Sequence, residues 1–146
     1  MITSFSHIYH RVHDVEASMA WYTKHLGFAL LRKYSMGGRV SGYLTLNGVL
    51  LELTQAAHPD TDIPKPEAQE RRLGLTTDNI DAEFARLRAE GVTIIQEPYD
   101  ARTFWGKQGA IQDLNGYVIS LREWAAPDDP TFADWQPKHE GVTRLG

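Results

Sequence analysis

The sequence contains no cysteine, which excludes disulfide bonds, thiolate catalysis and cysteine-based zinc sites. It also has no cluster of lysine and arginine, and its net charge of −4 argues against a nucleic-acid partner. No apolar run approaches the roughly 20 residues that span a bilayer, and the N-terminus lacks the basic start and apolar core of a signal peptide. We therefore expect a cytoplasmic protein with no membrane and no nucleic-acid partner.

Several catalytic signatures are missing as well. The sequence has no glycine-rich phosphate loop, no Ser-His-Asp order and no nucleophile elbow. Its 146 residues, 42% apolar and 23% charged, are typical of an ordinary globular protein. That length is enough for one domain, or for two small units that share a core.

The first part of the chain predicts a strand, a helix and three strands. In the strand at residues 5–13, alternate side chains face opposite sides. Asp14 is a typical helix N-cap, and Gly27 ends a helix whose apolar residues recur every three or four positions. Three further strands are expected at residues 28–34, 40–46 and 49–54.

The second part repeats this order after a polar, proline-containing stretch at residues 55–70, which favours neither helix nor strand. A strand at residues 72–77 leads to a helix capped by Asp78 or Asn79 and ended by Gly91. The remaining strands are expected at residues 92–96, 107–112 and 117–121. The polar tail at 124–146, with Phe132 and Trp135 as anchors, either packs on its own surface, covers a cavity or reaches a neighbouring subunit.

Three pairs of corresponding residues set the period of this repeat. The helix N-caps are 65 residues apart, the helix-ending glycines 64 and the Asn-Gly pairs 68, as given by Asp14/Asn79, Gly27/Gly91 and Asn47/Asn115. We therefore predict an α+β protein built from two βαβββ modules, at residues 1–54 and 71–123. Residues 55–70 connect the modules and residues 124–146 follow them, within one structural domain overall.

The motifs and their order resemble the vicinal oxygen chelate superfamily, which includes glyoxalases, bleomycin-resistance proteins and extradiol dioxygenases. The resemblance covers residues 5–123 and is carried by His7-Ile8 with Val12 and Asp14, by the helix end at residues 21–28, and by the sequence Asp-Leu-Asn-Gly-Tyr at 113–117. It implies two curved mixed sheets that form a cup, closed within one chain or across two. We expect a homodimer, because two small sheets leave apolar surface to cover.

Metal-using members of that family place ligands on the first and last strands of each module, which here means His7, Glu52, Arg72 and Ser120. Imidazole and carboxylate suit a divalent metal. A guanidinium has no lone pair to offer, and a serine is a weak neutral ligand. We therefore expect no metal cofactor, and we expect Arg72 to pair with Glu52 in place of an ion.

Glu52 is the strongest functional candidate, because a carboxylate in an aliphatic run must be paired or protonated when buried. We assign catalytic roles to Glu52 and His7. A cup suited to a flat or aromatic molecule with an acidic or carbonyl group is expected to be lined by Tyr9, Arg11, Tyr43, Arg72, Trp105 and Ser120.

Three functions are compatible with this sequence. The first is a metal-independent protein that binds a small organic ligand, by sequestration or for acid/base chemistry. The second is a lyase, isomerase or dioxygenase with a divalent metal at His7 and Glu52. The third is a non-catalytic dimeric interaction module.

Overall fold

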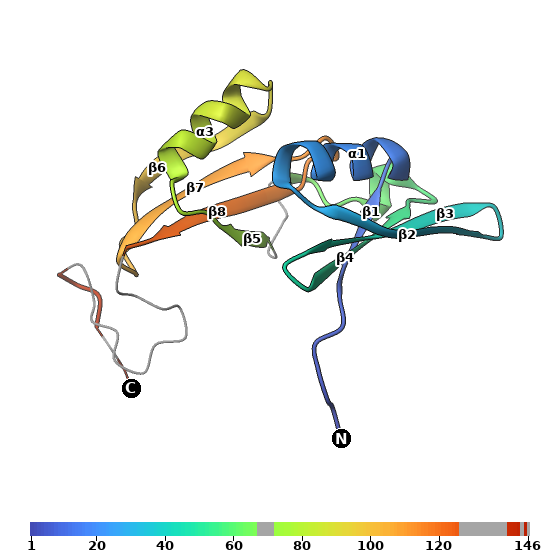
Figure 1. The fold of residues 1–146 in the computed structure, drawn as a ribbon, viewed down its shortest axis with the longest axis horizontal. Helices are drawn as coiled ribbons and strands as arrows, with labels where there is room; N and C mark the ends of the chain where they lie inside the picture. Colours follow the sequence, from blue (N-terminus) through green and yellow to red (C-terminus); the bar gives the residue numbers. More distant parts are fainter. Residues whose placement is uncertain (67–71, 126–139, 144, 146) are drawn as a thin grey trace. The chain divides into compact units, whose positions relative to one another are not determined.

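The computed structural model of the protein describes residues 1–66, 72–125, 140–143 and 145 (Figure 1). The chain separates into two compact units, Met1–Ala68 with Leu114–Gly116, and Gln69–Asp113 with Tyr117–Gly146. Each unit contains one βαβββ module, so the predicted α+β architecture is confirmed. The expected anchors Phe132 and Trp135 lie outside the described residues.

The first module consists of β1 (Ile8–Val12), α1 (Val15–Leu26), β2 (Ala29–Met36), β3 (Arg39–Leu46) and β4 (Val49–Gln55). Its strands form an open sheet in the order β1-β4-β3-β2. β1 pairs with β4 in parallel, whereas β2, β3 and β4 form an antiparallel meander. The first and last strands of the module are therefore neighbours in space.

The second module repeats this topology with β5 (Leu73–Thr76), α3 (Ile80–Ala89), β6 (Thr93–Asp100), β7 (Gly106–Gln112) and β8 (Val118–Trp124). The strand order is β5-β8-β7-β6, again with one parallel pair, β5 and β8. The short helix α2 (Pro59–Asp62) lies between the modules in sequence.

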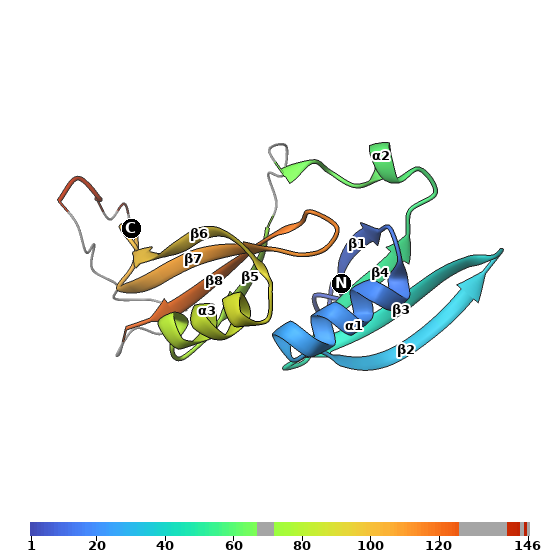
Figure 2. The same cartoon turned by 90° about the horizontal axis from the view of Figure 1, so that it is seen from above.

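Each long helix runs across one face of its own sheet (Figures 1 and 2). The Asp14 carboxylate accepts a hydrogen bond from the backbone N–H of Ala17, and the Asn79 side chain does the same for Ala82, as expected for N-caps. The buried residues of the helices and the helix-facing residues of the strands form the two cores, which include Val12, Tyr22, Leu44, Leu51 and Leu53 in one module and Ile80, Phe84, Leu87, Ile111 and Ile119 in the other. We call the opposite side of each sheet its open face.

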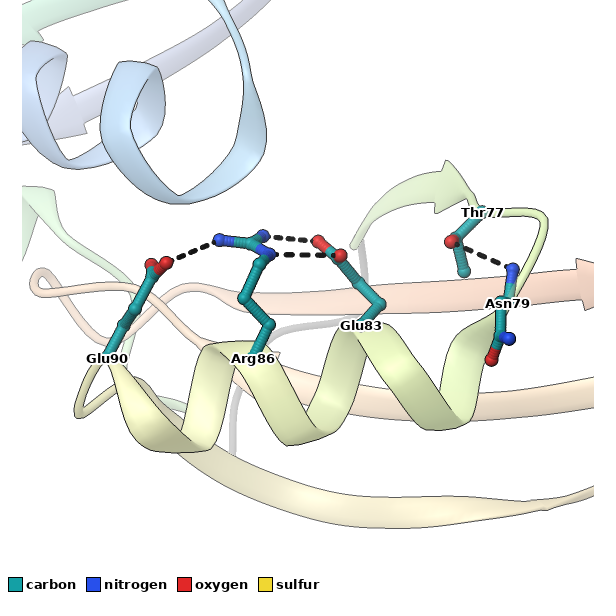
Figure 3. A network of polar contacts seen from close by, with 5 residues as sticks. All are labelled: Thr77, Asn79, Glu83, Arg86 and Glu90. Atoms are coloured by element: carbon teal, nitrogen blue, oxygen red, sulfur yellow. Dashed lines mark hydrogen bonds and ion pairs between the residues drawn. The ribbon is translucent and has the colours of Figure 1, made fainter.

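Helix α3 carries a line of polar contacts along a partly buried side (Figure 3). Arg86 donates hydrogen bonds to Glu83 one turn before it and to Glu90 one turn after it. These carboxylates raise the pKa of Arg86, the bond to Glu83 being the larger cause. Because the side chain is more than one-third exposed, solvent screens the pairs, and they contribute only about 0.5 kcal/mol to helix stability.

A glycine on the third strand of each module admits the helix. A Cβ on Gly42 would lie 2.5 Å from Sδ of Met19, and a Cβ on Gly109 would lie 2.5 Å from Cζ of Phe84. The two glycines are separated by 67 residues, which is within the period set by the caps and turns. They are therefore a further pair of corresponding positions, which the pattern of apolar residues does not reveal.

The two Asn-Gly pairs of the repeat have different structures. Asn47 and Gly48 both have positive φ, at 49° and 83°, and form the two-residue turn between β3 and β4. Asn115 instead is buried, and its side chain accepts a hydrogen bond from the backbone N–H of His13 and donates one to Oγ of Ser18. The same dipeptide therefore closes a hairpin in one copy and joins separate segments in the other.

The strands extend beyond their predicted limits in several places. β2 reaches Met36, β8 reaches Trp124, and β6 continues through Pro98 to Asp100. Proline is compatible with β6 because this strand lies at the edge of its sheet. The stretch expected to contain no helix includes α2, which begins at Pro59, a residue suited to the first turn. None of the helices in the described part of the chain is long and apolar enough to span a membrane.

Candidate functional site

A row of polar and aromatic side chains crosses the open face of the first sheet. Register places Tyr9 of β1 opposite Glu52 of β4, Glu52 opposite Tyr43 of β3, and Tyr43 opposite Arg32 of β2. Because neighbours of Glu52 along β4 point to the other side, Leu51 and Leu53 are buried under α1 while Glu52 faces away from it. This explains how one carboxylate can stand in an aliphatic strand.

Glu52 is held by donors from three parts of the module: the residue before β1, strand β2 and strand β3. Nε2 of His7 lies 3.0 Å from Oε2 of Glu52, and the Tyr34 hydroxyl donates to Oε1 at 3.0 Å. His7 is the residue before β1, and its Nδ1 lies 2.9 Å from the Ser6 hydroxyl. Glu52 lies on the open face of the sheet, but the residue as a whole is only 9% exposed. The structure thus brings together the two residues predicted to be catalytic.

Tyr43 completes this cluster. A hydrogen bond to the Glu52 carboxylate, supported by partial burial and by the negative charge of Glu52, raises the pKa of the Tyr43 phenol. The ring also makes an edge contact with His7 at 5.9 Å, stacks on Tyr34 at 6.3 Å and lies 5.6 Å from the Arg32 guanidinium carbon. Tyr43 therefore stays a neutral hydrogen-bond donor at physiological pH.

Tyr9 and Arg11 lie on the same face, since they alternate along β1 with the buried Val12 and since Tyr9 pairs with Glu52. Tyr9 is 45% exposed and is available for contact with a ligand. Arg11 donates a hydrogen bond to Oδ2 of Asp62 at 2.8 Å, and the same oxygen accepts from the backbone N–H groups of Ala57 and His58 at 3.0 Å. Arg11 thus fixes the α2 segment to β1 in addition to its predicted binding role.

We expect the pH dependence of stability to reveal this Asp62 contact. The backbone N–H of His58, followed by Arg11, lowers the pKa of Asp62. A lowered pKa means that ionised Asp62 stabilises the fold above the unfolded pKa of about 3.9, and that this stabilisation is lost as pH falls through the folded pKa. Asp62→Asn should therefore lower Tm by a few degrees at pH 7, with a difference from the wild-type protein that shrinks below about pH 4.

Thermal unfolding followed by circular dichroism between pH 3 and pH 7 measures this effect. Asp60→Asn is the matched control, because Asp60 lies on the same short helix and is exposed. If the two variants had equal Tm at every pH, the assigned role of Asp62 would be wrong.

The second module places two further predicted residues at one hollow. Arg72 and Ser120 both line a depression of about 520 Å³ on the open face of its sheet. Trp105, in the loop before β7, is 42% exposed and does not line this depression. Because Arg72 belongs to the second module and Glu52 to the first, the ion pair expected between them stays a prediction.

Sequence reasoning missed several residues of these faces, among them Tyr34, Arg122, Gln96 and Gln108. The signal for Tyr34 was present in the turn at Gly37 and Gly38, both with positive φ. A two-residue turn fixes the register Met36 to Arg39, which puts Tyr34 opposite Ser41 and on the face of Glu52. Arg122 required the observed extension of β8 beyond residue 121, whereas Gln108 lies within the strand predicted at residues 107–112.

His7 and Glu52 alone are too few ligands for a divalent-metal site. His7 and Glu52 are suitable ligand types, but each carboxylate oxygen of Glu52 already faces a protein donor. Among the described residues there is no group of three or more histidine, aspartate or glutamate side chains that could hold an ion.

Comparisons with known proteins agree with the fold. The family model described as glyoxalase/bleomycin resistance protein/dioxygenase superfamily matches residues 4–121. A search of curated proteins gives no match. The solved structure of UcmS2 is 25% identical, with a TM-score of 0.67, and the match covers 84% of this chain and 99% of that one.

Two other solved structures are similar in fold. A glyoxylase/bleomycin resistance protein/dioxygenase domain from Frankia sp. EAN1pec has a TM-score of 0.72 at 17% identity, covering 88% of this chain and 96% of that one. Glyoxalase I from Zea mays has a TM-score of 0.69 at 22% identity, covering 82% of this chain but only 44% of that one. The family match over residues 4–121 and the two βαβββ modules show that the chain belongs to the glyoxalase/bleomycin resistance protein/dioxygenase superfamily.

Proposed function

We propose that the protein binds a small aromatic or carbonyl-containing organic molecule without a metal cofactor, and that Glu52 and His7 act on it or hold it. The observation that carries this proposal is the carboxylate of Glu52, which lies on an open sheet face beside His7, Tyr34 and Tyr43. Protein groups on such a face that combine aromatic rings with a few convergent polar atoms are typical of ligand sites.

The chemistry of this cluster suits two roles. The neutral phenol of Tyr43 donates to Glu52 in the free protein; turned to a ligand carbonyl instead, it leaves a lone pair of the Glu52 carboxylate to accept a proton or a hydrogen bond from the same molecule. His7 orients Glu52 through the 3.0 Å contact. If the ligand carries an acidic C–H beside its carbonyl, Glu52 acts as the base; if not, the same contacts sequester the ligand.

Replacing Glu52 should separate these roles. A panel of neutral aromatic ketones and aldehydes is titrated by ligand-detected NMR into protein treated with a chelator. We expect binding to survive chelation and Glu52→Gln to weaken it about tenfold, because the amide removes the charge and reverses one hydrogen bond. Glu16→Gln, on the exposed side of α1, is the matched control and should bind normally.

Exchange of ligand hydrogen in deuterium oxide then distinguishes catalysis from sequestration. Incorporation by the wild-type protein that Glu52→Gln abolishes identifies Glu52 as a base, and binding without incorporation identifies sequestration. Binding that disappears on chelation and returns with zinc, nickel or manganese would contradict the metal-independent proposal. Equal binding by the Glu52 and Glu16 variants would remove Glu52 from the site.

We also propose a homodimer, because β2 leaves apolar side chains uncovered at the sheet edge. All eight residues of β2 are exposed, including Leu30 at 58%, Leu31 at 51% and Met36 at 77%. Light scattering coupled to size-exclusion chromatography should give twice the 16.5 kDa chain mass. Leu31→Lys should shift the protein toward monomer, whereas Val49→Lys, on another exposed apolar residue, should not. A monomeric wild-type protein at micromolar concentration would rule this interface out.

A further inference from the structure

The hollow on the open face of the second sheet has a flat floor and a polar rim. Ser120 of β8 lies between Gly74 of β5 and Ala110 of β7, so the floor consists of small residues. Two residues along these strands, and so on the same face, Arg122 lies opposite Gln108, and Gln108 lies opposite Tyr99 of β6, whose hydroxyl it contacts. The corresponding floor positions in the first module are occupied by Tyr9, Glu52 and Tyr43, so only the second module leaves this space open.

The charged side chains that the described residues contribute to the hollow are all positive. They are Arg72 and Arg122, and none of the other described residues that line the hollow carries a carboxylate. Within the described part of the chain, no ion pair links either guanidinium to an acidic side chain, whereas Arg11, Arg86 and Arg88 each have a carboxylate partner. Two guanidinium groups beside one depression, neither ion-paired to a described acidic side chain, attract an anion and offer planar sets of N–H donors that match a carboxylate.

Aromatic contacts hold Arg122 in position. Its guanidinium carbon lies 5.3 Å from the centre of the Phe104 ring and 5.9 Å from that of Trp124, and the two rings pack at 4.4 Å. A cation–π contact restrains the guanidinium through its face and leaves the N–H groups at its edge for hydrogen bonds. Little side-chain freedom is then lost when an anion binds.

We propose that this hollow binds a planar aromatic carboxylate, with the carboxylate held by Arg72 and Arg122 and the ring lying over Gly74, Ser120 and Ala110. The inference rests on the proposed small-molecule binding, which it extends by committing to a carboxylate and by adding Arg122 and the floor residues to the expected Arg72 and Ser120. Gln96 and Gln108 provide amide groups at the rim, and Tyr99 provides an aromatic edge. A volume of about 520 Å³ exceeds what a bare inorganic anion fills, which favours a ligand with a ring system.

Four probes test the proposal by calorimetric titration at low ionic strength: 2-naphthoate, 2-naphthamide, 2-naphthyl phosphate and inorganic phosphate. We expect 2-naphthoate to bind at least tenfold more tightly than the neutral amide and more tightly than either phosphate. Arg72→Gln and Arg122→Gln should each weaken 2-naphthoate binding about tenfold. Arg39→Gln, which removes an exposed arginine from the first module, should leave binding unchanged. Backbone amide shifts on binding should concentrate at Gly74, Ala110 and Ser120.

Several results would overturn the proposal. These are equal affinity for naphthoate and naphthamide, unchanged affinity in folded Arg72 and Arg122 variants, amide shifts outside the second sheet, or no binding of any probe at millimolar concentration. Tighter binding of either phosphate would overturn the carboxylate assignment. The results distinguish failure of this inference from failure of the proposed function. If neutral ketones bind through Glu52 but naphthoate does not bind, only this inference is overturned. Naphthoate bound through the arginines, with no neutral ligand bound, overturns only the proposed function.

Discussion

Gly109→Ala is expected to destabilise the second module by about 2–3 kcal/mol, because the new methyl group has no space. It would lie 2.5 Å from Cζ of Phe84, which is 1% exposed, and 3.0 Å from the carbonyl oxygen of Gln96. A buried aromatic ring cannot turn away without disturbing the core between α3 and the sheet. Urea unfolding followed by circular dichroism measures the change in the free energy of unfolding.

Gly74→Ala is the matched control for this substitution. It makes the same chemical change on a strand of the same sheet, but its Cβ would have no atom within 4 Å. We expect it to be neutral or slightly stabilising, since alanine reduces the freedom of the unfolded chain. In a double-mutant cycle, Phe84→Leu should remove part of the penalty of Gly109→Ala. Additive effects of these two substitutions would show that the ring is not the cause.

Asn115→Ala should destabilise the protein by about 2 kcal/mol, because it removes two hydrogen bonds at a buried position. The Asn115 side chain accepts from the backbone N–H of His13 at 3.0 Å and donates to Oγ of Ser18 at 3.0 Å. Ser18 is fully buried, so water does not replace the lost donor. Asn115→Asp tests the assignment further, since it keeps the acceptor for His13 but loses the donor to Ser18.

The other Asn-Gly pair supplies the comparison. Asn47 lies in an exposed hairpin turn with φ of 49°, so Asn47→Gly should leave the free energy of unfolding nearly unchanged, because glycine adopts this conformation freely. At position 115, glycine should destabilise as much as alanine does. If Asn115→Gly were as well tolerated as Asn47→Gly, the buried hydrogen bonds would have no role in stability.

These contrasts mark what the sequence could and could not predict. Both long helices, their caps and the order of strands follow from local signals, such as Asp14 before an apolar stripe and glycine after it. The position of Glu52 on the open face follows from the alternation of side chains along a strand. The two roles of Asn-Gly cannot be predicted in this way, because the dipeptide indicates a turn preference but not which distant groups the asparagine side chain contacts.

The missed residues share a physical cause. The partnership of Tyr34 with Glu52 is diagonal across three strands, and the hollow beside Arg122 depends on β8 continuing to Trp124. Strand ends depend on pairing with a neighbour more than on local propensity, which is why β6 could pass through Pro98. Gly42 and Gly109 were missed because the space that a helix occupies over a sheet is a tertiary property.

The parallel pairing of the first and last strands in each module has a consequence for the order of folding. β2, β3 and β4 can form by successive hairpins, whereas β1 joins β4 only after a long loop that contains α1 has closed. His7 therefore meets Glu52 as the final step of its module, and a partly folded chain lacks this contact. The time at which the His7–Glu52 contact appears during refolding would therefore report when the module is completely folded.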